Sequence, residues 1–429
     1  MKSRLVLPSV AVGLGLLVGC SAATLHMIPA PVLYKDDRID LSQRLPPHLR
    51  STQLQTFYAT NRAPASSGKS GHYTAGENET VTLGTADVTL GDVDWRWEDL
   101  VASDRTDTIE HPRPARVDQV QEFGPLRGGE EMNEAEQTFV SRIDEHLAMT
   151  RNQDVVLYVH GYRVTFDEVS VLMASFARYL GHAATVSFQW PTNLHVWSYL
   201  TDCPRARKHI PDIERLIELV SHTKAERLNL VAYSCGSPLL ADALVRLRAR
   251  YSAEQSEALR QRFRIGNVIF AASDIDVKTF ARESFLPIRE LAAQIVVYIS
   301  KNDSALGFAS LVAGRSRVGR PDLSELTRED LAAFAADPRF EVIDVTDVRG
   351  AHEMGGMKGH GYWFANEWIS SDVTISMRYP IPARQRCLQP GPLKNTWRLP
   401  ADYPDCLVKR LIETYPDARR LPAPPPDLR

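Results

Sequence analysis

The sequence predicts an α/β fold, a mostly parallel sheet with helices on both faces. Short runs of mainly apolar residues alternate with segments of helical spacing through the second and third quarters of the 429-residue chain. Buried parallel strands read as continuous apolar runs, and their alternation with helices is typical of parallel sheets. Ligands bind such sheets at the carboxyl ends of the strands, so polar residues there are the candidates for a site.

Residues 1–19 are predicted to be a targeting signal and are excluded from the fold. They have a positive start and an apolar stretch too short to span a bilayer comfortably. The stretch ends in Leu-Val-Gly-Cys at Cys20, which resembles a bacterial lipobox and implies cleavage before this cysteine and its lipidation. An ordinary cleaved signal is the alternative. Ser21, which follows, resembles the pattern of lipoproteins in the outer membrane, facing the periplasm.

The segments before the predicted core have weaker patterns. Residues 20–52 contain four prolines among charged residues and no sustained period, which indicates a tether. Residues 53–150 are assigned to N-terminal strands and an insertion of the main domain. Their predicted parts are an edge strand at 54–62, a second strand or hairpin at 81–93, an irregular insertion at 94–131 and an amphipathic helix at 134–150, capped by Asn133.

The regular alternation of strands and helices falls in residues 151–370, the predicted catalytic core. Apolar runs predict strands at 155–159, 185–190, 228–232, 268–272, 295–299 and 340–345. Helical spacing predicts helices around 166–180, 213–220, 239–247 and 280–291. Residues 371–429 are rich in proline and are predicted to form a C-terminal extension.

A serine lies where a predicted strand turns into a helix. Ala232 and Gly236 stand two residues before and two residues after Ser234. Small residues at these places keep the backbone clear of a nucleophile on a sharp strand-to-helix turn. The N–H of Cys235 would lie at the helix N-terminus, where developing negative charge is stabilised. The alternative is an ordinary strand–loop–helix connection with a capping serine.

Residues 160–162, His-Gly-Tyr, follow the first core strand as a tight turn. The backbone N–H of Tyr162 could join that of Cys235 to form an oxyanion hole. We expect His160 itself to support the loop by hydrogen bonding and not to act as a base.

The acid and the base should follow the serine in the order Ser, Asp, His. An imidazole can take and return the serine proton near neutral pH, and a carboxylate fixes its tautomer. Asp303 follows one predicted strand and His360 follows the last. The alternatives are Asp274 or Asp276 for the acid and His352 for the base. Asp274 also reads well as the N-cap of the next helix.

Six short motifs together resemble a bacterial α/β-hydrolase family of largely uncharacterised proteins. The resemblance covers about residues 54–370, and its motifs lie at 59–62, 159–162, 189–191, 232–236, 301–306 and 359–362. It implies Ser234 as nucleophile, Asp303 as acid and His360 as base. The family more often has His-Ser-Met-Gly at the serine turn, whereas Tyr233 and Cys235 stand here.

These observations predict an envelope-anchored hydrolase that cleaves small carboxylic esters through an acyl-enzyme. The three residues do not specify the leaving group, so a thioesterase, amidase or peptidase is the alternative. A non-catalytic scaffold lipoprotein with the same fold is an alternative of another class. An apolar segment at 190–200 would either pack under a loop or form a substrate wall suited to an acyl chain.

The charge balance and the cysteines limit which partners, cofactors and disulfides the sequence predicts. The chain has 50 Lys+Arg against 53 Asp+Glu and no long basic run with aromatics, which argues against nucleic acid. Neither Cys-x-x-Cys nor Cys/His metal spacing is present, so no metal or other cofactor is predicted. Export to an oxidising compartment favours a disulfide between Cys387 and Cys406. Cys235 is expected to contribute only its N–H, so its replacement by alanine should be mild.

Overall fold

One mixed sheet of twelve strands connects the segments that the structure describes. The computed structural model describes residues 24–43, 45–66, 71–106, 111–129, 131–351, 359–379 and 381–421. In spatial order, the strands of these residues are β1 (Leu25–His26), β4 (Pro114–Pro125), β3 (Tyr73–Leu90), β2 (Gln53–Pro64), β6 (Ala184–Gln189), β5 (Asp154–Val159), β7 (Arg227–Tyr233), β8 (Ile265–Ala271), β9 (Gln294–Ile299), β10 (Phe340–Asp344), β12 (Thr396–Arg398) and β11 (Gln389–Pro390). The predicted signal, Cys20 and His352 lie outside the described residues.

The sheet is parallel from β2 to β12, which confirms the predicted fold class and all six core strands, with small shifts at their ends. Helices cover both faces of the sheet, because the strands carry apolar side chains on both faces, as β5 illustrates. Val155 and Leu157 belong to one apolar cluster, and Val156 and Tyr158 belong to the other, on the opposite face.

The helices of the predicted core lie where the spacing places them, and others occur outside it. The described helices are α1 (Val32–Lys35), α2 (Trp97–Thr106), α3 (Glu134–Met149), α4 (Phe166–Tyr179), α5 (Tyr199–Ala206), α6 (Ile210–Val220), α7 (Gly236–Arg250), α8 (Ser256–Phe263), α9 (Val277–Thr279), α10 (Phe285–Leu291), α11 (Ser304–Ala313), α12 (Arg328–Ala336), α13 (Tyr362–Ala365), α14 (Glu367–Arg378) and α15 (Tyr403–Thr414). A π-helical turn at Phe280–Ser284 precedes α10. Asn133 caps α3 as predicted, through a capping box with Glu136.

The N-terminal strands differ from the prediction. β2 is not an edge strand, because it lies between β3 and β6 and is buried on both faces. The irregular insertion predicted at 94–131 is also wrong, since this stretch contains α2 and β4. In β4 the apolar residues Val117 and Val120 are three apart, because a bulge opposite Val88 interrupts the pairing with β3. The alternation expected of a strand is therefore broken in the sequence.

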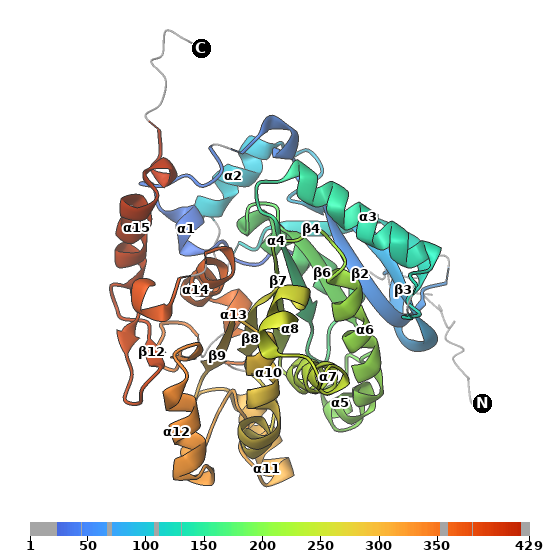
Figure 1. The fold of residues 1–429 in the computed structure, drawn as a ribbon. Helices are drawn as coiled ribbons and strands as arrows, with labels where there is room; N and C mark the ends of the chain where they lie inside the picture. Colours follow the sequence, from blue (N-terminus) through green and yellow to red (C-terminus); the bar gives the residue numbers. More distant parts are fainter. Residues whose placement is uncertain are drawn as a thin grey trace, which may run out of the picture.

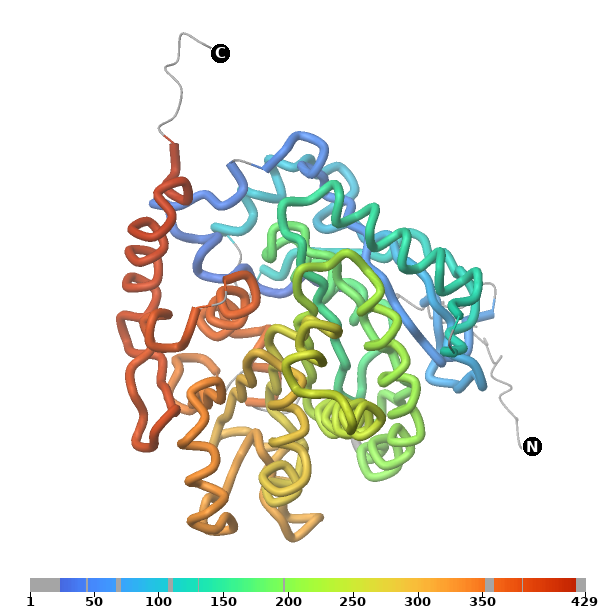
Figure 2. The backbone as a smooth tube through the Cα atoms, in the orientation of Figure 1, coloured from blue at the N-terminus to red at the C-terminus, as the bar shows by residue number. Residues whose placement is uncertain are grey.

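The predicted tether is wrong for the described part of 20–52. Ile28, Leu33 and Ile39 are buried in the same apolar cluster as α4 and α14. Figures 1 and 2 show this N-terminal segment returning to lie beside α15, and Ile39 pairs with Arg419. The segment contacts the core through single side chains between prolines, so the sequence has no period that would reveal its burial.

The C-terminal extension is likewise part of the fold. Tyr403, Leu407 and Val408 of α15 are buried, and β12 continues the sheet beside β10. None of the described helices is long and apolar enough to cross a membrane.

Candidate active site

Ser234 occupies a sharp turn between β7 and α7. Its φ is 52°, in the left-handed region that non-glycine residues rarely adopt. A Cβ on Gly236 would lie 2.4 Å from the carbonyl oxygen of Val159, so only glycine fits there. The backbone of β5 therefore passes close beneath the serine turn. The alternative of a capping serine is wrong, because the N-cap of α7 is Cys235 and α7 has no side-chain cap bond.

The structure brings Ser234, His360 and Asp303 into one hydrogen-bonded chain. His360 Nδ1 lies 2.8 Å from Asp303 Oδ2, and His360 Nε2 lies 2.8 Å from Ser234 Oγ. With the proton on Nδ1, the ring donates to the carboxylate and accepts from the serine hydroxyl. All three side chains are buried or nearly so. This arrangement can move a proton from the serine to the imidazole while the carboxylate stabilises the imidazolium.

Asp303 is held in place by the helix that follows it. Its second carboxylate oxygen, Oδ1, accepts a hydrogen bond from the N–H of Leu306 at 2.9 Å and so caps α11. The same carboxylate therefore serves a helix N-terminus and an imidazole. Because α11 starts directly after the turn that follows β9, the acid is fixed at the carboxyl edge of the sheet.

The alternative acids have other partners. Tyr199 Oη donates to Asp274 Oδ2 at 2.8 Å, and Arg317 Nε lies 3.2 Å from Asp274 Oδ1. Burial raises the pKa of the Asp274 carboxyl, and Arg317 partly offsets this effect. The predicted capping role of Asp274 is wrong. Asp276 caps α9 instead, by accepting from the N–H of Thr279 at 2.8 Å.

Asp274 does not cap the next helix because of the path that the backbone takes after β8. The N–H of Asp274 donates to the carbonyl of Ser234 at 3.3 Å, so the chain first wraps around the serine turn and the helix begins later.

His160 supports the turn after β5, as expected. Its Nδ1 donates to the carbonyl of Gly161, and its ring stacks on Trp190 with 5.0 Å between centroids. Trp190 Nε1 in turn donates to the carbonyl of His160 at 2.9 Å. Burial, with a smaller effect from Arg62, lowers the pKa of His160 well below its usual value. Its partners and burial hold it neutral, and it does not bond Ser234.

The two predicted oxyanion donors flank the serine. Cys235 follows it directly. Tyr162 follows Gly161, where a Cβ would lie 3.0 Å from the Cβ of Ser234. Tyr162, Ser234 and His360 line the same pocket.

This pocket has a volume of about 210 Å³ and an apolar wall. The wall comes from two segments, α11 and residues 197–200. The apolar segment of the sequence thus has two parts. Trp190 is buried in the core, whereas Trp197, Tyr199 and Leu200 line the pocket.

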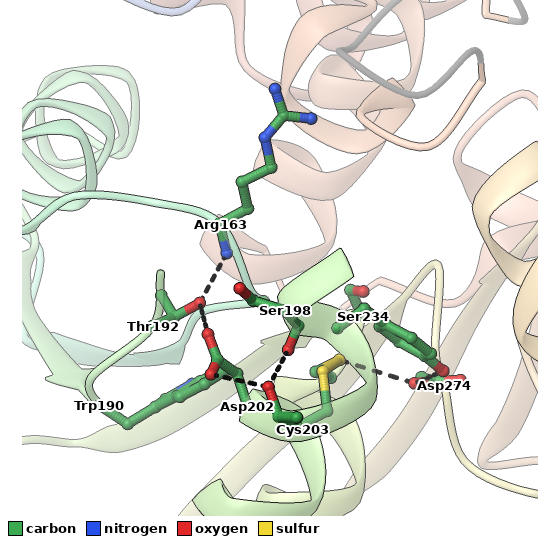
Figure 3. Close-up of a disulfide and its surroundings, with 12 residues drawn as sticks. Arg163, Trp190, Thr192, Ser198, Asp202, Cys203, Ser234 and Asp274 are labelled. Carbon is green, nitrogen blue, oxygen red and sulfur yellow. Dashed lines mark hydrogen bonds between the residues drawn. A yellow bond between two sulfur atoms is a disulfide. The ribbon is translucent and has the colours of Figure 1, made fainter. Parts of the chain in front are cut away.

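Two residues of the serine turn differ from the family pattern, Tyr233 and Cys235, and both make contacts at the site. The ring of Tyr233 packs against the ring of His360, with 5.0 Å between centroids. Cys235 forms a disulfide with Cys203 of α5, which sequence reasoning missed. Figure 3 shows this bond next to Ser234 and Asp274. When Cys20 and the predicted pair are set aside, Cys203 and Cys235 remain of the five cysteines. This even number was the signal in the sequence for a second disulfide.

The disulfide joins the pocket wall to the serine turn. Hydrogen bonds also hold α5 directly beside the disulfide, because Thr192 Oγ1 and the N–H of Asn193 both approach Asp202 Oδ2, at 3.3 and 2.7 Å. The N–H of Arg163 donates to Thr192 Oγ1 at 2.9 Å (Figure 3). The predicted disulfide between Cys387 and Cys406 is also present in the structure. Among the described residues no group of three or more His, Cys, Asp or Glu side chains could hold a metal ion.

A family model agrees with the fold. A family model described as alpha/beta hydrolase of unknown function (DUF900) matches residues 135–376, which is more than half of the chain. No curated protein matches the sequence significantly. The solved structure of an esterase, Est22, is similar at 12% identity over 81% of this chain and 83% of that chain, with a TM-score of 0.27. The family match and the parallel sheet with its serine turn lead to one conclusion: the chain belongs to this family of α/β hydrolases of unknown function.

Proposed function

We propose that the protein is a serine hydrolase that cleaves carboxylic esters with an apolar acyl group. The observation that carries this proposal is the hydrogen-bonded chain of Ser234, His360 and Asp303 at an apolar pocket. A serine activated by an adjacent imidazole is the general device for acyl transfer.

In the proposed reaction, Ser234 Oγ attacks the carbonyl carbon of the ester while His360 Nε2 takes its proton. The N–H groups of Tyr162 and Cys235 stabilise the negative charge on the carbonyl oxygen. The tetrahedral intermediate collapses, His360 returns the proton to the departing alcohol, and an acyl-enzyme remains. Water, deprotonated by His360, then attacks the acyl-enzyme to release the acid and free Ser234. Asp303 keeps the imidazole in one orientation throughout.

The size of the pocket limits the acyl group. A cavity of about 150 Å³ can hold benzene, so the pocket of about 210 Å³ has room for roughly eight carbon atoms. Leu306, Phe308 and Leu200 supply apolar contacts and leave few polar groups to satisfy. We expect the highest kcat/KM for esters of short and medium acyl chains.

The test uses fluorophosphonate labelling together with rates on a series of p-nitrophenyl esters. Ser234→Ala should lose labelling and all but a residual rate, because binding and oxyanion donors remain while covalent catalysis is lost. Ser237→Ala is the matched control, since Ser237 is a buried serine three residues further on, at the start of α7. Normal labelling and turnover of Ser234→Ala would refute the proposal.

The same experiment separates the alternatives. Faster turnover of matched thioester or anilide substrates would move the function to a thioesterase or amidase. A wild-type protein that neither labels nor turns over any of these substrates would be a non-catalytic scaffold.

We further propose that the protein is anchored to the bacterial envelope through lipid on Cys20, in the outer membrane facing the periplasm. Support comes from the sequence alone, with residues 17–20 for the lipid on Cys20 and Ser21 for the outer membrane. Metabolic labelling with a palmitate analogue should mark the wild type and not Cys20→Ser, and the variant should leave the membrane fraction. Equal labelling of both proteins would refute this anchor.

A further inference from the structure

A second apolar groove lies away from Ser234, between α12 and the strands at the C-terminal end of the sheet. Figure 1 shows α12 on the same side of the molecule as β12. The groove has a volume of about 460 Å³. None of the residues of α12 is buried, although Leu331 and Phe334 face the sheet from it as lining residues. The helix packs on β10 through Phe334, whose ring centroid lies 4.9 Å from that of Phe340, and the groove lies beside this contact.

The floor of the groove is apolar and continuous with one core cluster. Val297 and Ile299 of β9 and Phe340 and Val342 of β10 share one face of the sheet, because residues two apart in a strand point the same way. A cavity of about 150 Å³ can hold benzene, so this groove has room for roughly eighteen carbon atoms. Its volume also lies within the range of about 300–1,000 Å³ that is typical of small-molecule sites.

The groove has four basic residues at its edge: Lys301, Arg328, Lys394 and Arg398. All four are exposed, and none forms an ion pair with another described residue. The acidic lining residue is Asp344, whose Oδ1 already accepts two hydrogen bonds from Thr346. Four cations against the one carboxylate of Asp344 leave the lining of the groove with a net positive charge.

Three of the four cations gather at one end. Lys301 follows β9, and Arg398 pairs in register with Asp344 at the end of β10. Arg328 is the first residue of α12, which runs back to the start of β10 and so begins near the same end.

We propose that this groove binds a long-chain fatty acid, with the chain on the apolar floor and the carboxylate among Lys301, Arg328 and Arg398. An apolar cavity with cations at one end is complementary to an amphiphile that has one chain and one negative charge. This site does not depend on Ser234 or on the proposed esterase activity.

The experiment uses the full protein and a photoreactive palmitate analogue with a diazirine on its chain. Cross-linked peptides should map to 323–336 and 391–398, and unlabelled palmitate should compete. Hexadecanol, which has the chain without the charge, should compete at least about tenfold less well.

Charge reversal tests the head-group contacts. Lys301→Glu with Arg398→Glu should raise the palmitate concentration needed for half competition by about tenfold or more, with an unchanged melting temperature. The matched control is Arg384→Glu with Arg410→Glu, which reverses two exposed arginines outside the groove. The proposal is overturned if cross-links fall only in the Ser234 pocket or nowhere, if hexadecanol competes as well as palmitate, or if both double variants behave alike.

Discussion

At the scale of single residues, Asp303 combines two tasks that can be separated by mutation. Its Oδ2 bonds the imidazole of His360, and its Oδ1 caps α11. Asn is as good an N-cap as Asp, but its amide favours the wrong imidazole tautomer.

Asp303→Asn should therefore lower kcat by about three to four orders of magnitude with little change in melting temperature. Asp303→Ala should lose the same activity and, in addition, about 1 kcal/mol of stability, because the cap is gone. Ester hydrolysis and thermal melts of both variants check this. Full activity in Asp303→Asn would mean that this carboxylate does not act on the base.

His182 gives the fold a dependence on pH. Burial, with the positive charge of nearby His146 and Arg178, lowers the pKa of His182 to about 4. The unfolded chain, with a histidine pKa of about 6.5, takes the proton first as the pH falls. The stabilising contribution of neutral His182 is therefore complete above pH 6.5 and is lost as the pH falls toward 4. Its upper bound is about 3 kcal/mol.

His182→Asn removes this titration, and asparagine tolerates the φ of 62° at this position. Urea unfolding between pH 7.5 and 4 should show a steeper loss of stability in the wild type than in the variant. His195→Asn, at an exposed histidine, is the control. Parallel curves for the wild type and His182→Asn would contradict the assignment.

At the scale of elements, the disulfide between Cys203 and Cys235 joins α5 to the serine turn. The expectation that Cys235 contributes only its N–H is therefore wrong, because its side chain has a covalent partner, and we now expect a larger effect from its replacement. The Cys387–Cys406 bond is a matched control, since it joins α15 to the segment before β11. The two bonds close loops of 32 and 19 residues.

Replacing either cysteine pair by serine should lower the free energy of unfolding by about 3–4 kcal/mol in the chain-entropy account. Only the Cys203→Ser with Cys235→Ser variant should lose activity, by at least about tenfold, because it frees the pocket wall and the Cys235 N–H together. Denaturation curves and ester rates of both double variants measure these effects. Equal activity in the two would show that α5 does not need the bond to position the site.

At the scale of the whole molecule, the two ends of the described chain fold together. The N–H of Asp40 donates to the carbonyl of Ala418 at 3.0 Å, and the N–H of Arg420 donates to the carbonyl of Arg38 at 3.0 Å. Leu33 is fully buried beneath this junction. The N-terminal segment thus contributes to the core cluster of the C-terminal helices.

Leu33→Ala should therefore cost about 2–4 kcal/mol, as for other buried leucines. Val93→Ala is the control, because Val93 is 83% exposed and its loss should stay within about 0.5 kcal/mol. Chemical denaturation of both variants compares them. Equal stabilities would mean that the N-terminal segment is not coupled to the core.

The sequence by itself determined the order of the central strands and helices and the candidates Ser234, Asp303 and His360. Buried parallel strands must be apolar throughout, and a sharp serine turn requires small neighbours, so both features are written in local sequence. The burial of single residues such as Leu33 and Ile39 and the pairing of β4 left no such local pattern, because isolated contacts and a bulge replace the regular period.

Only the tertiary structure decided which of several carboxylates reaches the imidazole. Asp274 and Asp303 both follow core strands, yet Asp303 bonds His360 whereas Asp274 bonds Tyr199 and Arg317. The tertiary structure alone also decided that Cys203 bonds Cys235 and that a groove lies beneath α12. Each depends on distances between residues far apart in the chain, which the type and spacing of the side chains do not encode.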